Sequence, residues 1–111
     1  MDIEFVSRRA ARLFNDDKAL RRHFGAQRAR IIRRRLDQLR AAPCLADMRS
    51  LPGRTHPLRG DRAGQLAMTI EANTRLVFEP ADEPLPTYAD GGLDWTEVRT
   101  IRILEVVDYH G

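Results

Sequence analysis

Hydrophobic and polar positions repeat with different periods in the two halves of this chain. In the first half, apolar side chains recur every three or four residues, as along one face of a helix. From Arg54 onward they recur at every second residue, as in strands. A short run from Asp2 to Val6 precedes the helical half and predicts a strand. The pattern therefore predicts one strand, then helices, then a sheet.

Two to three helices are expected after the first strand. Ser7 stands at the N-cap position of the first helix, and a polar run over residues 15–17 interrupts it. A second helix covers Lys18 to Phe24, a third extends from about Ala26 to Ala42, and Leu45 to Ser50 adds one further helical turn. The third helix has an apolar face formed by Ala29, Ile32, Leu36 and Leu39 and a cationic face formed by Arg30, Arg33 and Arg34.

The second half predicts a hairpin followed by a long strand. Residues 66–70 and 75–79 form its two strands, joined by a turn over residues 71–74. Residues 80–95 are rich in proline, glycine and acidic side chains, which indicates an excursion outside the core. Residues 97–107 predict a central strand because apolar groups occupy both of its faces.

These elements predict an α+β fold, with an N-terminal strand and two to three helices packed on a three- to four-stranded, mainly antiparallel sheet. A length of 111 residues suits one domain, which we expect to span residues 1–111. No apolar run approaches the roughly 18 residues of a membrane span, and the first residues do not resemble a signal peptide. We therefore expect a cytoplasmic protein without a membrane partner.

Residue counts argue against metal and disulfide chemistry. Cys44 is the one cysteine, so neither an internal disulfide nor a cysteine-rich zinc module can form. The three histidines, at positions 23, 56 and 110, lack the short spacings of zinc ligands, and no glycine-rich phosphate loop occurs. We expect no metal and no cofactor.

The net charge of +3 conceals an uneven distribution. Residues 1–62 contain 16 Arg or Lys against 7 Asp or Glu, whereas residues 63–111 contain 3 against 9. Nearly all of the basic residues are arginine, whose planar guanidinium binds phosphate with two hydrogen bonds. A polyanion is therefore an expected partner. The alternative is a solvated helix face in an arginine-rich composition.

Several polar residues occupy positions that suggest chemistry. His56 lies in a loop, Arg75 opens a strand, and an apolar strand leads directly into Asp108, Tyr109 and His110. A strand that continues into an acid, a phenol and an imidazole holds these groups near the sheet, whereas chain ends are normally frayed. The structural alternatives are an ordinary loop histidine at position 56 and a solvated tail over residues 108–110.

Two blocks of the sequence resemble the HigB branch of the RelE/ParE toxins. The first is THPLRGDRAGQ from Thr55 to Gln65, followed by RLVF from Arg75 to Phe78, and the second is EVVDYH from Glu105 to His110. The resemblance covers most of the chain. The sequence departs from the family pattern in three respects: Leu66 and Thr74 replace frequent tryptophans, Gly111 follows the usual terminal histidine, and the segment from Pro80 to Trp95 is longer than expected.

The resemblance implies a toxin of a type II toxin–antitoxin pair, with a small microbial-ribonuclease-like fold, that enters the ribosomal A site and cuts mRNA there. It also implies a cognate helix-turn-helix antitoxin as partner, with operator DNA contacted only through that antitoxin. By position, the family's catalytic group matches His56, Arg75, Asp108, Tyr109 and His110. Arg59 stands where a substrate-contacting lysine or arginine is usual, and we expect RNA contacts from Arg59, Arg62, Arg30, Arg33 and Arg34.

Metal-free RNA cleavage needs a base for the 2′-OH proton, an acid for the departing 5′ oxygen and a cation for the phosphate. Histidine suits the first two parts because its ordinary pKa of about 6.5 lies near working pH. We expect His56 and His110 as this pair, in either order, with Arg75 on the phosphate. Asp108 would orient an imidazole, and Tyr109 would stack on a base or share a proton. Strand alternation places Asp108 and His110 on one face and Tyr109 on the other, so either the terminus curls or Tyr109 plays a different part.

Two alternatives remain open at this point. A ParE-like toxin on the same fold poisons DNA gyrase and needs no histidine pair. A catalytically inactive basic module would only bind nucleic acid or an antitoxin. The cationic face of the third helix is expected to dock on ribosomal RNA phosphates, which would carry no base specificity.

Overall fold

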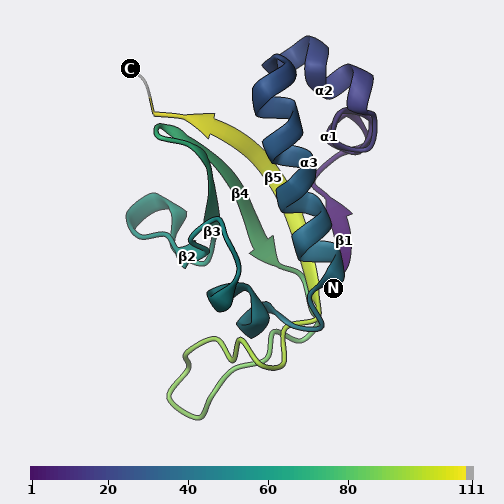
Figure 1. The fold of residues 1–111 in the computed structure, drawn as a ribbon. Coiled ribbons are helices and arrows are strands. Elements are labelled where there is room, and N and C mark those ends of the chain that lie inside the picture. Colours follow the sequence, from purple (N-terminus) through teal and green to yellow (C-terminus); the bar gives the residue numbers. More distant parts are fainter. Residues whose placement is uncertain (110–111) are drawn as a thin grey trace.

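The chain folds into a five-stranded sheet, and its longest helix lies across one face of that sheet (Figure 1). The computed structural model describes residues 1–109. The helices are α1 (Arg8–Phe14), α2 (Asp17–Phe24) and α3 (Ala26–Ala41), with short 3₁₀ helices η1 (Leu45–Ser50) and η2 (Gly60–Arg62). The strands are β1 (Asp2–Phe5), β2 (His56–Pro57), β3 (Leu66–Glu71), β4 (Thr74–Pro80) and β5 (Thr100–Asp108).

The strand order is β1-β5-β4-β3-β2, with β1 parallel to β5 and the other pairs antiparallel. The predicted α+β class and the central position of the last strand are confirmed. Two details differ. The sheet gains a two-residue edge strand, β2, and β5 begins at Thr100 instead of Glu97. The later start has a local cause, because Asp94 accepts hydrogen bonds from the backbone and hydroxyl of Thr96 and holds that stretch in a turn.

Helix α1 starts at the predicted N-cap, and α2 starts at a cap that was not predicted. The Ser7 side chain accepts a hydrogen bond from the backbone N–H of Ala10, which confirms it as the N-cap of α1. Asp16 caps α2 in the same way through the N–H groups of Lys18 and Ala19. Gly25, with φ of 88°, then joins α2 directly to α3 in a conformation that residues with a Cβ rarely adopt.

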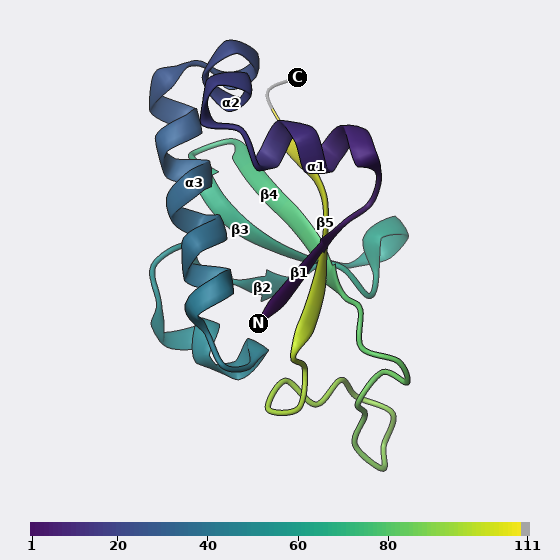
Figure 2. The same ribbon diagram turned by 90° about the vertical axis from the view of Figure 1, so that its right-hand side faces the viewer.

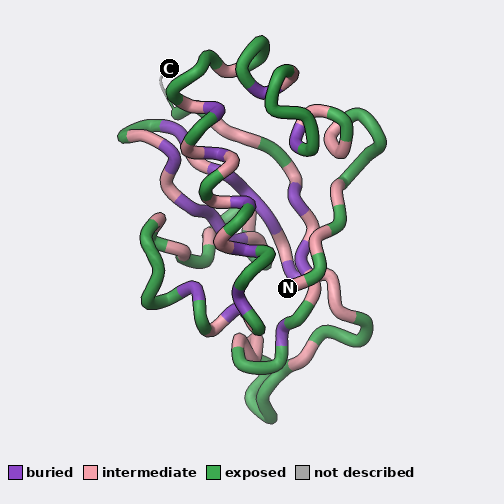
Figure 3. The backbone as a smooth tube through the Cα atoms, turned by 45° about the vertical axis from the view of Figure 1, so that its right-hand side comes forward, coloured by how far each residue is buried: buried purple, intermediate pink, exposed green. Residues whose placement is uncertain are grey.

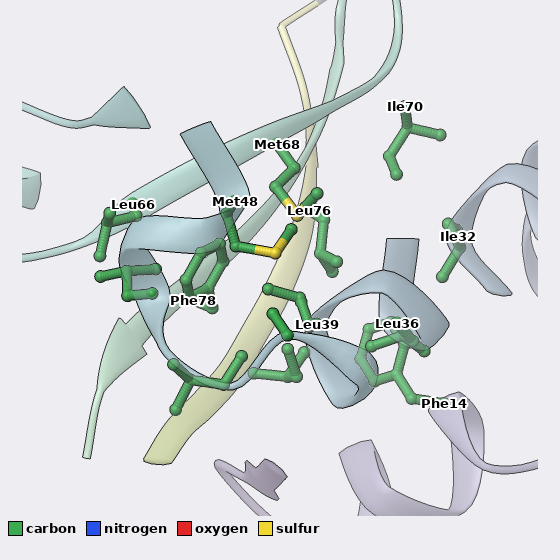
Figure 4. Packing of buried hydrophobic residues seen from close by; sticks show 14 of the residues in the cluster. Phe14, Ile32, Leu36, Leu39, Met48, Leu66, Met68, Ile70, Leu76 and Phe78 are labelled. Carbon is green, nitrogen blue, oxygen red and sulfur yellow. The ribbon is translucent and has the colours of Figure 1, made fainter. Parts of the chain in front are cut away.

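Helix α3 covers the sheet with the predicted apolar face. Ala29, Ile32, Leu36 and Leu39 are all buried, and they join one hydrophobic cluster with the side chains of β3, β4 and β5 that point toward α3 (Figure 4). Residues 66–68 of β3 and 76–78 of β4 are buried on both faces of the sheet, whereas buried and half-buried positions alternate at the start of β5 (Figure 3). The sheet members of the cluster are Leu66, Met68, Ile70, Leu76, Phe78, Ile101 and Ile103.

The segment between β4 and β5 extends away from the sheet (Figure 2). The prediction of an excursion outside the core is correct for its exposed residues, which include Leu85 and Tyr88. It is wrong for Leu93 and Trp95, which pack against the core cluster. Arg49 of η1 also lies over the Trp95 ring, 4.3 Å from its centroid, so the excursion is anchored at its base. Within residues 1–109 no helix is long and apolar enough to cross a bilayer.

Candidate functional site

One row of paired residues crosses the sheet face that points away from α3. His56 is opposite Ala67, Ala67 is opposite Val77, and Val77 is opposite Glu105. Directly opposite residues in antiparallel strands place their side chains on the same face. The neighbouring positions, such as Leu66, point to the helix side. His56 and Glu105 therefore lie at the two ends of one row, on what we call the open face of the sheet.

A second row brings Arg75 to the open face. Arg75 is opposite Thr69 in β3 and opposite Val107 in β5, two positions along β4 from Val77. With about 4.8 Å between strands and about 3.4 Å per residue, the Cα atoms of His56 and Arg75 are roughly 12 Å apart. The two residues therefore lie on the same face of the sheet, with β3 between them.

The loop between β2 and β3 covers part of the open face and delivers Arg62 to it. In Figure 2 this loop and its helix η2 lie on the side of the sheet opposite α3. The Arg62 guanidinium reaches β5, where Nη2 donates to Glu105 Oε2 at 2.8 Å, while Nη1 donates to Gln65 Oε1 at 2.7 Å. This crossing explains why Ala67 and Val77 are buried although they are not part of the core cluster on the helix side.

Electrostatics place Tyr109 near Arg62. The hydrogen bond to Glu105 raises the pKa of the Arg62 guanidinium above its ordinary value; burial opposes this rise, and the negative charge of Glu105 and then that of the Tyr109 phenolate add to it. Tyr109 is 54% exposed, and its backbone N–H donates to the carbonyl of Asn73 in the β3–β4 turn at 2.7 Å. The phenol is therefore available on the same side as Arg62.

Arg75 holds the turn that Tyr109 contacts. Its Nη1 donates to the carbonyls of Glu71 at 2.8 Å and of Ala72 and Thr74 at 3.1 Å each. These bonds fix the guanidinium at the end of the hairpin. Arg75 and Tyr109 thus both lie at the β3–β4 turn, while His56, Arg62 and Glu105 lie in the row across the middle of the sheet.

His56 is exposed, and a backbone carbonyl determines which of its two ring nitrogens carries the proton. The ring nitrogen Nδ1 lies 2.7 Å from the carbonyl oxygen of Arg54. Because a carbonyl oxygen can only accept, Nδ1 carries the proton in this contact. In the neutral ring, Nε2 is then the unprotonated nitrogen, and it can take up a proton.

Asp108 lies on the other side of the sheet from this group. Its partner across β4 is the buried Thr74, and its Oδ2 lies 3.6 Å from Nη1 of Arg28 in α3. Arg28 also donates from Nε to Glu71 Oε2 at 2.9 Å, a bond that raises the pKa of the guanidinium. The structure therefore places Asp108 beside Arg28 and on the face opposite His56. Arg28 was missed by the sequence analysis, although its position one turn before Ile32 puts it on the sheet-facing side of α3.

The predicted RNA-binding arginines divide into two groups. Arg30 and Arg34 are exposed on α3, and Arg59 is exposed just before η2. Arg33 instead donates to Asp17 Oδ1 at 2.7 Å and to the carbonyl of Phe14, so it ties α3 to the α1–α2 junction.

A groove of about 330 Å³ runs between α2 and α3, lined by Asp17, Arg21, Ala26, Ala29, Arg30 and Arg33.

Two further predictions concern His110 and metals. His110 lies outside the described residues. Among residues 1–109, no three side chains of His, Cys, Asp or Glu come together as a set of metal ligands.

Known structures resemble this fold over its whole length. A YoeB/ParE toxin from Agrobacterium tumefaciens is 15% identical, with a TM-score of 0.56 over 99% of this chain and 100% of the other. The YoeB–YefM complex from Staphylococcus aureus is 16% identical, with a TM-score of 0.58 over 100% and 98%. A YoeB dimer from Staphylococcus aureus is 17% identical, with a TM-score of 0.56 over the same shares.

The chain has the fold of these toxins. At identities of 15–17%, the likeness shows the fold alone, and these structures are of YoeB and ParE toxins, whereas the sequence resemblance was to HigB. No protein-family model matches the sequence, and no curated protein matches it.

Proposed function

We propose that this protein is the toxin of a type II toxin–antitoxin system and a metal-independent endoribonuclease that cuts mRNA in the ribosomal A site. The fold supports this proposal, because it is shared over the whole chain with YoeB toxins, one of them in a complex with YefM. The observation that supports the proposal is the open face, which carries His56 and Arg62 in the row across the sheet and Arg75 and Tyr109 at the neighbouring β3–β4 turn.

The chemistry that these groups support is attack of a 2′-oxygen on the neighbouring phosphorus. His56 Nε2 takes the 2′-OH proton, and Arg75 and Arg62 stabilise the charge that gathers on the phosphate oxygens. The bond to the 5′ oxygen breaks, and a proton is delivered to that oxygen. We assign this proton to His110, the other histidine of the catalytic group that the sequence resemblance implies, because His56 is here the base. The products are a 2′,3′-cyclic phosphate and a 5′-hydroxyl.

The proposed partners follow from the same assignment. We place the protein in the HigB branch, with a helix-turn-helix antitoxin that alone connects it to operator DNA, and in the cytoplasm where its ribosomal substrate is found. Arg30 and Arg34, exposed on α3, and Arg59, exposed near the open face, would contact RNA phosphates.

An alanine series tests the proposal. His56→Ala is expected to lower mRNA cleavage in a translating extract by roughly 10² to 10⁴, and Arg75→Ala by roughly 10² to 10³, with loss of growth arrest in cells. His23→Ala is the matched control, because His23 is an exposed histidine on α2, outside the open face, and thermal unfolding checks that each variant folds.

Two outcomes would count against the nuclease. If His56→Ala and Arg75→Ala both leave cleavage and growth arrest intact, the mechanism is wrong. If growth arrest coincides with broken DNA and uncut message, the protein is a gyrase poison of the ParE kind.

A further inference from the structure

The backbone is strained at the residue that contacts the His56 ring. Arg54 has a φ of 52°, and among the non-glycine residues of the described part of the chain it alone has a positive φ. This left-handed conformation is disfavoured for a residue with a Cβ and persists only where the surroundings enforce it. The carbonyl oxygen that accepts from His56 Nδ1 belongs to this same residue.

The segment before Arg54 is clamped between α3 and β3. The carbonyl of Gly53 accepts from Thr69 N–H at 2.7 Å, and Arg35 donates from Nε to the carbonyl of Thr69 at 2.9 Å. Gln38 completes the clamp by donating from Nε2 to the carbonyl of Pro52 at 3.2 Å. The left-handed turn is therefore held from the helix side of the sheet.

Gly53 shows how closely the clamp fits. Its φ is 113°, and a Cβ built there would lie 2.9 Å from both Arg35 Nε and Met68 Cε. A side chain there would force Arg35 or Met68 to move, and the positive φ disfavours any residue with a Cβ. The direction of the next carbonyl, that of Arg54, is consequently set by the fold and is not left to a mobile loop.

We propose that Arg54 is a positioning residue whose left-handed backbone holds His56 in the Nδ1–H tautomer, which makes Nε2 of His56 the base. Free histidine favours the opposite tautomer, with the proton on Nε2. In that form the lone pair of Nδ1 would face the Arg54 carbonyl oxygen, and the two would repel. A backbone carbonyl that accepts from one ring nitrogen fixes both the tautomer and the orientation of the ring. The catalytic consequence rests on the proposed function, whereas the tautomer does not.

Substitutions at position 54 distinguish the effect of the backbone conformation from the effect of the side chain. Arg54→Gly and Arg54→Asn remove the guanidinium but accept a positive φ, whereas Arg54→Val removes the same charge and resists that conformation. If the backbone conformation matters, the first two variants keep the wild-type behaviour and the third loses it. Arg54→Ala, with an unbranched Cβ, serves as a milder probe if the valine variant does not fold.

The direct measurement is the ¹⁵N shift pattern of the His56 ring in long-range ¹H–¹⁵N NMR spectra, recorded at alkaline pH on the neutral ring. We expect a protonated Nδ1 and an unprotonated Nε2 in the wild type, Arg54→Gly and Arg54→Asn, and a shift toward protonated Nε2 in Arg54→Val. Cleavage by Arg54→Val should fall roughly 10- to 100-fold below that of Arg54→Gly, by analogy with the effect of losing a partner that orients a metal-binding histidine.

Each result decides a separate point. A wild-type ring with its proton on Nε2, or an unchanged Nδ1–H pattern in Arg54→Val and Arg54→Ala, overturns the proposal. Equal loss of cleavage in the glycine and valine variants also overturns it, because the guanidinium and not the backbone would then be responsible. If the Nδ1–H pattern is found but His56→Ala still cuts RNA, the ring is positioned as proposed and the nuclease assignment is what fails.

Discussion

Glu105 Oε2 lies 2.8 Å from Arg62 Nη2, and this ion pair joins the η2 loop to β5 across the two strands between them. Both side chains are partly open to water, at 31% for Arg62 and 53% for Glu105. Exposed pairs of this kind contribute about 0 to 1 kcal/mol to stability. The pair has a larger effect on the binding of anions, because the Glu105 carboxylate on the open face repels the RNA phosphate that the proposed function requires there.

Removal of that carboxylate should therefore strengthen RNA binding. Glu105→Gln is expected to raise the affinity for a short RNA several-fold at low salt, while the free energy of unfolding changes by less than about 1 kcal/mol. Fluorescence anisotropy and thermal unfolding measure the two quantities. Glu83→Gln, at an exposed acid in the excursion, is the control with the same charge change. An unchanged or weaker affinity in Glu105→Gln would show that RNA does not approach this face.

Arg62 should contribute one phosphate contact. Arg62→Ala is expected to flatten the slope of log affinity against log salt concentration by about 0.7 for single-stranded RNA, the value for the loss of one contact. Arg8→Ala, at an exposed arginine of α1, provides the comparison. If both variants change the slope equally, Arg62 makes no specific phosphate contact, and RNA binding depends only on the total charge of the protein.

The cap of α2 should carry a measurable share of stability. Asp16→Ala removes the side chain that accepts from Lys18 N and Ala19 N, so it should lower the free energy of unfolding by about 1 kcal/mol. Urea denaturation gives this value. Arg22→Ala, on an exposed position of the same helix, is expected to stay within about 0.5 kcal/mol of wild type. A loss no larger than that of the control would mean that the cap does not form in solution.

Tyr88 should titrate at higher pH than a free tyrosine. Its hydrogen bond to Asp94 favours the neutral phenol, and the negative charge of Asp94 adds to the effect, so the pKa of Tyr88 is raised. The stabilisation from this bond is fully present below the ordinary tyrosine pKa of about 10 and is lost as pH rises through the raised pKa. Ultraviolet titration of Tyr109→Phe isolates Tyr88, since the chain has two tyrosines. Asp94→Asn in that background should lower the midpoint, and an unmoved midpoint would exclude the bond.

Local sequence patterns were sufficient to predict most of the fold. The apolar stripe of α3 and the capping side chain of Ser7 act within a few residues, so periodicity and spacing identify them. The edge strand at His56–Pro57 could not be predicted in this way, because two residues carry no periodicity and the strand exists only through pairing with β3.

The arrangement of the candidate site depends on distant pairs. Arg28 meets Glu71, and Arg62 meets Glu105, each across 43 positions of the sequence. No local pattern encodes such contacts. Strand alternation did separate Asp108 from its neighbour Tyr109, and the structure agrees, but only the packing of α3 shows that Asp108 is the one on the helix side.

The most direct test of the account is cleavage of a ribosome-bound mRNA that carries a single 2′-deoxy nucleotide at the position cut in the all-ribose message. Attack by the 2′-oxygen, with His56 as its base, predicts that the deoxy substitution abolishes the cut, and that the all-ribose message yields a 2′,3′-cyclic phosphate and a 5′-hydroxyl. Undiminished cleavage of the deoxy-substituted message would contradict the proposed chemistry.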